Sequence, residues 1–129
     1  MPSKPAFLLG ISTLAAVVSL NPVLAQQAAV QGTAAREIQR RELVSNFAQD
    51  AVNKGNEALQ NQDYESAYAY FKSAVDSLPS GGPATSSLRV EAMNGFEESV
   101  LKLAKTRISE GRYKDAATTL NVILEDKYE

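Results

Sequence analysis

Residues 55–79 read GNEALQNQDYESAYAYFKSAVDSLP, and the second half of this stretch has a helical period. Apolar residues fall there at positions i, i+3, i+4, i+7, i+8 and i+11, which places them on one face of an amphipathic helix. They are Ala67, Tyr70, Phe71, Ala74, Val75 and Leu78. The polar turn Asn61-Gln62-Asp63 precedes this helix, and short turns join antiparallel neighbours. The stretch therefore predicts a helical hairpin.

A second segment near the end of the chain has the same kind of pattern. Its apolar residues, at i, i+3, i+4, i+7, i+10 and i+11, are Tyr113, Ala116, Ala117, Leu120, Ile123 and Leu124. The turn Glu110-Gly111-Arg112 precedes it. Gly111 suits the positive-φ position that ends a helix, and Asn61 can take that role in the first hairpin. We expect Phe71 and Leu120 to be the main packing residues of the two hairpins.

Each turn is itself preceded by a segment with a helical pattern, about residues 36–60 and 88–110. The expected apolar face of the first consists of Ile38, Leu43, Phe47, Ala51, Ala58 and Leu59. That of the second consists of Met93, Phe96, Val100, Leu103, Ala104 and Ile108. The loop 79–87 is rich in proline, glycine and serine and separates the hairpins, at about 36–78 and 88–126. The predicted fold is all-α, with two stacked antiparallel hairpins, because neither can bury its stripe alone.

The first 25 residues have the anatomy of a signal peptide. Lys4 precedes an apolar run at residues 6–20, and the small-residue ending Val23-Leu24-Ala25 follows Pro22. A membrane anchor is the alternative, but this run is shorter than the roughly 20 residues that a spanning helix needs. We therefore expect cleavage after Ala25, a flexible leader at residues 26–35, a helical domain at 36–129, and no membrane insertion by the mature chain.

The composition argues against most enzyme classes. The chain has no cysteine and no histidine, so thiolate chemistry, cysteine-ligated metals and serine triads are excluded. With 13 basic and 15 acidic residues, it lacks the positive field that favours nucleic acid. The acids Glu97 and Glu98 are adjacent, and neighbours on a helix diverge, so they fit a solvated face. We expect a non-enzymatic protein without catalytic, cofactor-binding or metal residues.

Seven residues of the first hairpin resemble a tetratricopeptide repeat: Gly55, Ala58, Tyr64, Ala67, Phe71, Ala74 and Pro79. The second hairpin resembles the family more loosely, through Leu103, Ala104, Gly111, Tyr113, Ala116 and Leu120. Ala51 and Lys54 depart from the pattern, where tryptophan and leucine are usual. Tyr64 and Tyr113 are 49 residues apart, against 34 in a regular array.

The resemblance implies a protein-binding groove formed by the first helix of each pair. The positions that match are Val52, Asn56, Leu59, Gln60, Lys102, Lys105, Ile108 and Ser109. For the polar members, ordinary solvent-exposed surface is the alternative interpretation. Val52 stands where family members that grip a terminal carboxylate need a lysine, so a free C-terminus is not the expected ligand.

Three stretches are similar to leaders of secretin-like outer-membrane proteins of verrucomicrobial type, from type II or type III secretion or type IV pilus systems. They are residues 25–37, 78–85 and 107–116. This resemblance implies the N-terminal module of such a protein, periplasmic or associated with the outer membrane of a Gram-negative bacterium. Its partners would be envelope secretion or pilus components. A free periplasmic adaptor is the alternative. No ring-forming domain is present in the 129 residues, and no polar helix caps the last hairpin, so we expect a partner or further chain to cover it.

The export prediction can be tested by N-terminal sequencing. Expressed in a bacterium with a Sec pathway, the full chain should yield a mature protein that begins at Gln26. Recovery of the chain in the membrane fraction with Met1 retained would contradict the prediction.

Overall fold

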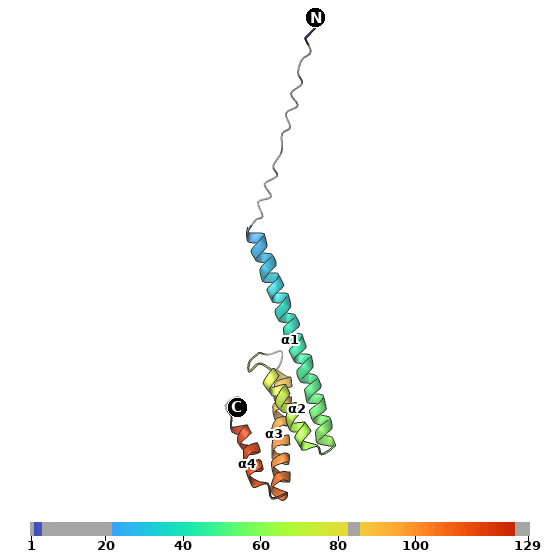
Figure 1. Cartoon of the computed structure of the whole chain (residues 1–129), viewed down its shortest axis with the longest axis vertical. Coiled ribbons are helices and arrows are strands. Elements are labelled where there is room, and N and C mark those ends of the chain that lie inside the picture. Colours follow the sequence, from blue (N-terminus) through green and yellow to red (C-terminus); the bar gives the residue numbers. More distant parts are fainter. Residues whose placement is uncertain (1, 4–21, 83–85, 126–129) are drawn as a thin grey trace. The chain divides into compact units, whose positions relative to one another are not determined.

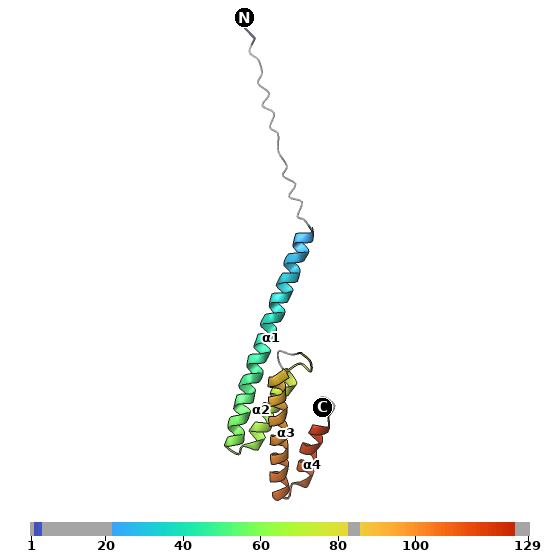
Figure 2. The same cartoon turned by 180° about the vertical axis from the view of Figure 1, so that it is seen from behind.

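The computed structural model describes residues 2–3, 22–82 and 86–125, and helices are the only regular elements in these residues. α1 spans Pro22–Gln60 and α2 spans Tyr64–Ser77. α3 spans Ser86–Ser109, α4 spans Tyr113–Asn121, and the 3-10 helix η1 spans Val122–Leu124. Consecutive helices run in opposite directions, as Figures 1 and 2 show from two sides. The predicted all-α class is confirmed.

The chain divides into two compact units, Met1–Ala34 and Ala35–Glu129, and the hairpins belong to the second. α1 begins at Pro22 rather than near residue 36. Residues 26–35, expected as a flexible leader, are helical and exposed. Alanine and glutamine dominate these residues, and both favour helix without tertiary contacts. Residues 4–21 lie outside the described residues, so the signal peptide stays a prediction.

Local charge pairs also favour helix where α1 continues into the second unit. Arg40 and Arg41 lie one turn after Glu37 in the helix, and both donate to its carboxylate at 2.8–2.9 Å. These hydrogen bonds, from Arg40 first and then Arg41, lower the pKa of Glu37 from 4.5 to about 2. Pairs at i, i+3 and i, i+4 stabilise a helix without any contact to a second element.

Both interhelical turns have the same hydrogen bonds. In the first, Asp63 N donates to Ala58 O at 2.9 Å and Gln62 N to Leu59 O at 3.1 Å. In the second, Arg112 N donates to Arg107 O at 2.8 Å and Gly111 N to Ile108 O at 3.0 Å. Both turns are Schellman motifs. Such a motif needs a positive φ at its next-to-last residue, which here is Gln62 or Gly111. Gly111 has φ 76°, as predicted, whereas Gln62 with φ 59° takes the place that we expected for Asn61.

The core is built around the ring of Phe71. An added Cβ at Gly55 of α1 would lie 2.8 Å from the ring, and one at Gly95 of α3 would lie closer still. Phe71 of α2 is therefore enclosed by the backbones of two helices, and only glycine leaves room for it at these two positions. Phe96 extends this contact by stacking on Tyr68 with ring centroids 5.7 Å apart.

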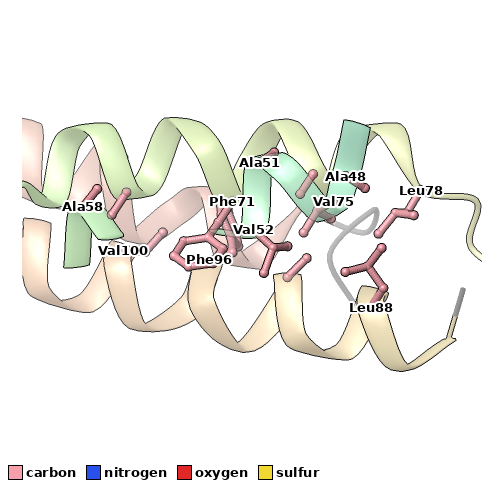
Figure 3. Packing of buried hydrophobic residues seen from close by; sticks show 13 residues of the cluster. Ala48, Ala51, Val52, Ala58, Phe71, Val75, Leu78, Leu88, Phe96 and Val100 are labelled. Carbon is pink, nitrogen blue, oxygen red and sulfur yellow. The ribbon is translucent and has the colours of Figure 1, made fainter. Parts of the chain in front are cut away.

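The rest of the core consists of small and branched side chains from α1, α2 and α3 (Figure 3). They are Ala48, Ala51, Val52, Ala58, Ala67, Ala74, Val75, Leu78, Leu88, Ala92 and Val100. Arg89 of α3 closes the end of α2, because its Nη1 donates to Leu78 O at 2.9 Å and to Val75 O at 3.3 Å. The guanidinium thus takes two carbonyls that the helix end leaves without a partner.

Parts of the predicted apolar faces are not covered. Ile38 and Leu43 are exposed, because α1 has 39 residues whereas α2 has 14 and covers only the end of α1. Phe47 is exposed too, although it lies beside Tyr68 and Lys72 of α2. In the second hairpin the prediction for Leu120 is wrong, since it is 36% exposed. Tyr113 and Leu124 are more exposed still. α4 packs on α3, and its buried residues are Ala116 and Thr119.

Replacing Gly95 by alanine tests the contact with Phe71. Helix propensity alone favours alanine by about 1 kcal/mol. The new methyl group, however, has to displace the ring, so we expect Gly95→Ala to lower the free energy of unfolding by about 1–3 kcal/mol in urea titrations.

Gly32→Ala is the matched control, because a Cβ there meets nothing within 4 Å, and it should cost no stability. Adding Phe71→Leu to Gly95→Ala should recover part of the loss, since leucine is shorter than the ring. A Gly95→Ala chain as stable as its parent would show that the ring is not confined as described.

Candidate functional site

The predicted groove depends on how α1 and α3 lie against each other. Asn56 Nδ2 of α1 donates to Glu91 Oε1 of α3 at 3.5 Å, so these two residues are level. The spacing of the turns aligns Asn56 with Lys105 instead, 49 residues further on. Residues of α1 and α3 that lie side by side are therefore 35 positions apart in the sequence. The turns that end these two helices are instead 49 positions apart. The difference arises because α3 continues past the level at which α1 ends (Figure 1).

The predicted α1 residues differ in what they can offer a partner. Val52 is fully buried among the core residues, so the prediction that it lines a groove is wrong. Its side chain has no surface to contact a ligand. Asn56 and Leu59 are half-buried, and Gln60 is exposed at the end of α1. Asn56, Leu59 and Gln60 thus remain as surface residues.

The four predicted α3 residues are all exposed, namely Lys102, Lys105, Ile108 and Ser109. The Lys102 ammonium lies 5.7 Å from the centroid of the Tyr64 ring, just after the turn that follows α1. Lys105, Ile108 and Ser109 are further along α3. The end of α3 extends beyond the end of α1 (Figure 2). The structure therefore places the predicted residues in two neighbouring groups rather than in one groove.

Charged residues form local pairs on this surface. Lys102 Nζ lies 2.7 Å from Glu98 Oε1, and this hydrogen bond raises the pKa of Lys102. Lys102 is thus a cation at neutral pH. Glu97 and Glu98 are both exposed, in keeping with the solvated face expected for them.

Arg107 is a structural residue that the sequence analysis missed. Its Nη2 lies 2.8 Å from Glu65 Oε1 of α2, and its Nη1 donates to Asp115 O and to Thr119 Oγ1 of α4. The guanidinium therefore joins α2, α3 and α4 in one polar contact. Its side chain is only 20% exposed, unlike the other paired arginines and lysines of the described surface, which are at least 33% exposed. The one available signal in the sequence is a basic residue in the last turn of α3.

The described residues show no group of three or more acids that could hold a metal ion. None of the helices in the described ranges is long and apolar enough to cross a membrane. One open hollow lies between α1 and α2, beside Phe47, Tyr68 and Lys72, and another lies beside residues 79–82 and Arg89.

No protein-family model matches the chain, and no significant match was found among curated proteins or solved structures. The function therefore has to be inferred from the surface residues and from the arrangement of the helices.

Arg107→Met should release α4 without unfolding the core. Losing charged hydrogen bonds in a largely buried place costs about 1.5–3 kcal/mol, so the amides of α4 should exchange hydrogen about 10–100 times faster. The amides of α2 around Phe71 should keep their protection, because they depend on the apolar core. Hydrogen exchange read by mass spectrometry measures both segments at once.

The matched control is Arg112→Met, since the ion pairs of Arg112 with Glu110 and Asp115 are exposed and surface pairs contribute little. Equal acceleration in the two variants would contradict the special role of Arg107.

Proposed function

We propose that this chain is a non-enzymatic protein-binding module of the cell envelope, built from two stacked hairpins of the tetratricopeptide type. Support comes from the two Schellman turns, which have identical hydrogen bonds 49 residues apart. The stacking is supported by Phe71, whose ring contacts both α1 and α3. Repeat hairpins of this kind bury their stripes against neighbours and leave one surface for partners.

The observation that carries the proposal is the exposed apolar surface of α3 next to charged residues. Ile108 is 47% exposed, with Lys105 and Ser109 beside it, and Leu59 is only half-buried at the end of α1. Large apolar side chains surrounded by polar ones are typical of protein-binding surfaces. Leu59 and Ile108 would be the apolar anchors, while Asn56, Gln60 and Lys102 would be the polar contacts.

The proposed location follows from the first 25 residues, which have the anatomy of a signal peptide. Export would place the module in the periplasm or at the outer membrane of a Gram-negative bacterium. Within the envelope, the resemblance at residues 25–37, 78–85 and 107–116 favours the N-terminal module of a secretin-like secretion or pilus protein. A free periplasmic adaptor is the second candidate, supported by the same surface without that resemblance.

A pull-down from the native envelope tests the proposal. With the full chain as bait, an identified secretion or pilus component should be recovered by the parent, and at least about tenfold less by Leu59→Asp/Ile108→Asp. A charge in an apolar contact costs several kcal/mol in a buried interface. Quantitative mass spectrometry of the captured proteins measures the difference.

Circular dichroism and thermal unfolding must first show that the variant folds, and Ile108→Asp alone is the milder form. Leu43→Asp serves as the matched control, because Leu43 is exposed on α1 away from this surface. Recovery of no secretion or pilus component would end the secretin proposal and leave the adaptor.

A further inference from the structure

Three exposed apolar residues lie along one line of α3. Val90 is 59%, Leu101 57% and Ile108 47% exposed, and they occupy positions i, i+11 and i+18. At about 100° per residue, these positions point in the same direction to within about 20°. The buried residues Ala92 and Ser99 lie on the opposite side of α3, facing the core. The line is therefore a row of three separated apolar side chains on the solvent side of the helix, and Glu97 lies between the first two.

Charged residues accompany this line in a fixed order. The acids Glu91, Glu97 and Glu98 come in the N-terminal half of α3, and the bases Lys102 and Lys105 come in the C-terminal half. All five are exposed. Glu97 falls within about 20° of the apolar line. The other four charged residues are turned away from the line around the helix, all in the same direction.

This order makes the face complementary to itself. If the helix is turned end to end, its acidic half lies opposite its own basic half. We propose that the exposed face of α3 pairs with the same face of a second copy, with the two helices antiparallel and the two-fold axis level with Ser99. In such an isologous contact every pairing occurs twice, once on each side of the two-fold axis.

The pairing follows from the positions along the helix. Val90 of one copy meets Ile108 of the other, and Leu101 packs beside Leu101 of the second copy across the axis. Glu98 meets Lys102 of the second copy, and Lys105 comes within one turn of Glu91. Glu97, on the line itself, comes level with Leu101 of the second copy. A parallel pair would instead place acid against acid and base against base, which is unfavourable.

The ion pair between Glu98 and Lys102 within one copy is compatible with this contact. It is an exposed pair, with side chains 52% and 44% accessible, and such pairs contribute little by themselves. A second copy would extend it to one network of four charges, two from each copy, beside the two-fold axis. The proposal names a partner for the α3 part of the surface and rests on the proposed protein-binding function.

Disulfide trapping tests the orientation, because the chain contains no cysteine. Val90→Cys and Ile108→Cys, introduced separately into the full chain and mixed under mild oxidation, should give a cross-linked heterodimer. Either variant alone should stay uncrosslinked, because an antiparallel pair separates identical positions at the ends of the line by about 27 Å. Cross-linking of Val90→Cys to itself, or none in the mixture, would overturn the proposal.

Sedimentation tests the charges independently. Lys102→Glu/Lys105→Glu and Glu97→Lys/Glu98→Lys should each dimerise at least about tenfold more weakly than the parent, and an equimolar mixture of the two should dimerise again. Leu124→Asp, on the exposed side of η1, should not change the dimer.

A parent chain that stays monomeric at millimolar concentration, or a dimer indifferent to both charge reversals, would overturn the pairing. That failure leaves the proposed protein-binding function standing, because the envelope pull-down tests it separately. Failure of the pull-down with an intact dimer would end only the secretin proposal.

Discussion

The packing of Phe71 between two glycines is the contact on which the fold depends. Its ring fills the space where α1, α2 and α3 come together, and Gly55 and Gly95 allow the backbones of α1 and α3 to approach it closely. Around the ring the core consists mainly of alanine and valine, which add little volume of their own. Close packing of helices gains its dispersion and hydrophobic energy only if the backbones come near, so the small residues and the single large ring are parts of one arrangement.

Away from this contact, the lengths of the helices decide what is covered. α2 reaches only the last part of α1, and Ile38, Leu43 and Phe47 stay exposed. α3 continues past the end of α1, and there it holds α4 through Arg107 rather than through a large apolar residue. The second hairpin therefore combines a small apolar contact at Ala116 with a polar one, and we expect it to open more readily than the first.

The same mismatch in length creates the surface proposed for partners. Because α1 and α3 are in register at Asn56 and Glu91, the far half of α3, which carries Lys105 and Ile108, extends past the end of α1. A regular repeat array would shield more of this helix. The charges on it are arranged by position, with acids before bases, so that both a foreign partner and a second copy would meet an ordered pattern rather than a uniform field.

The sequence by itself determined the all-α class, both hairpin turns and the buried face around Phe71, because helical periods and turn residues depend on neighbours along the chain. It also determined the positive φ at Gly111. Only the tertiary structure decided that Val52 is buried, that Leu120 is exposed and that Arg107 joins three helices. An apolar stripe shows which face can be buried, but its coverage depends on the length and register of the partner helices. The partners of a lone arginine are likewise set by residues up to 42 positions away, which no local pattern reveals.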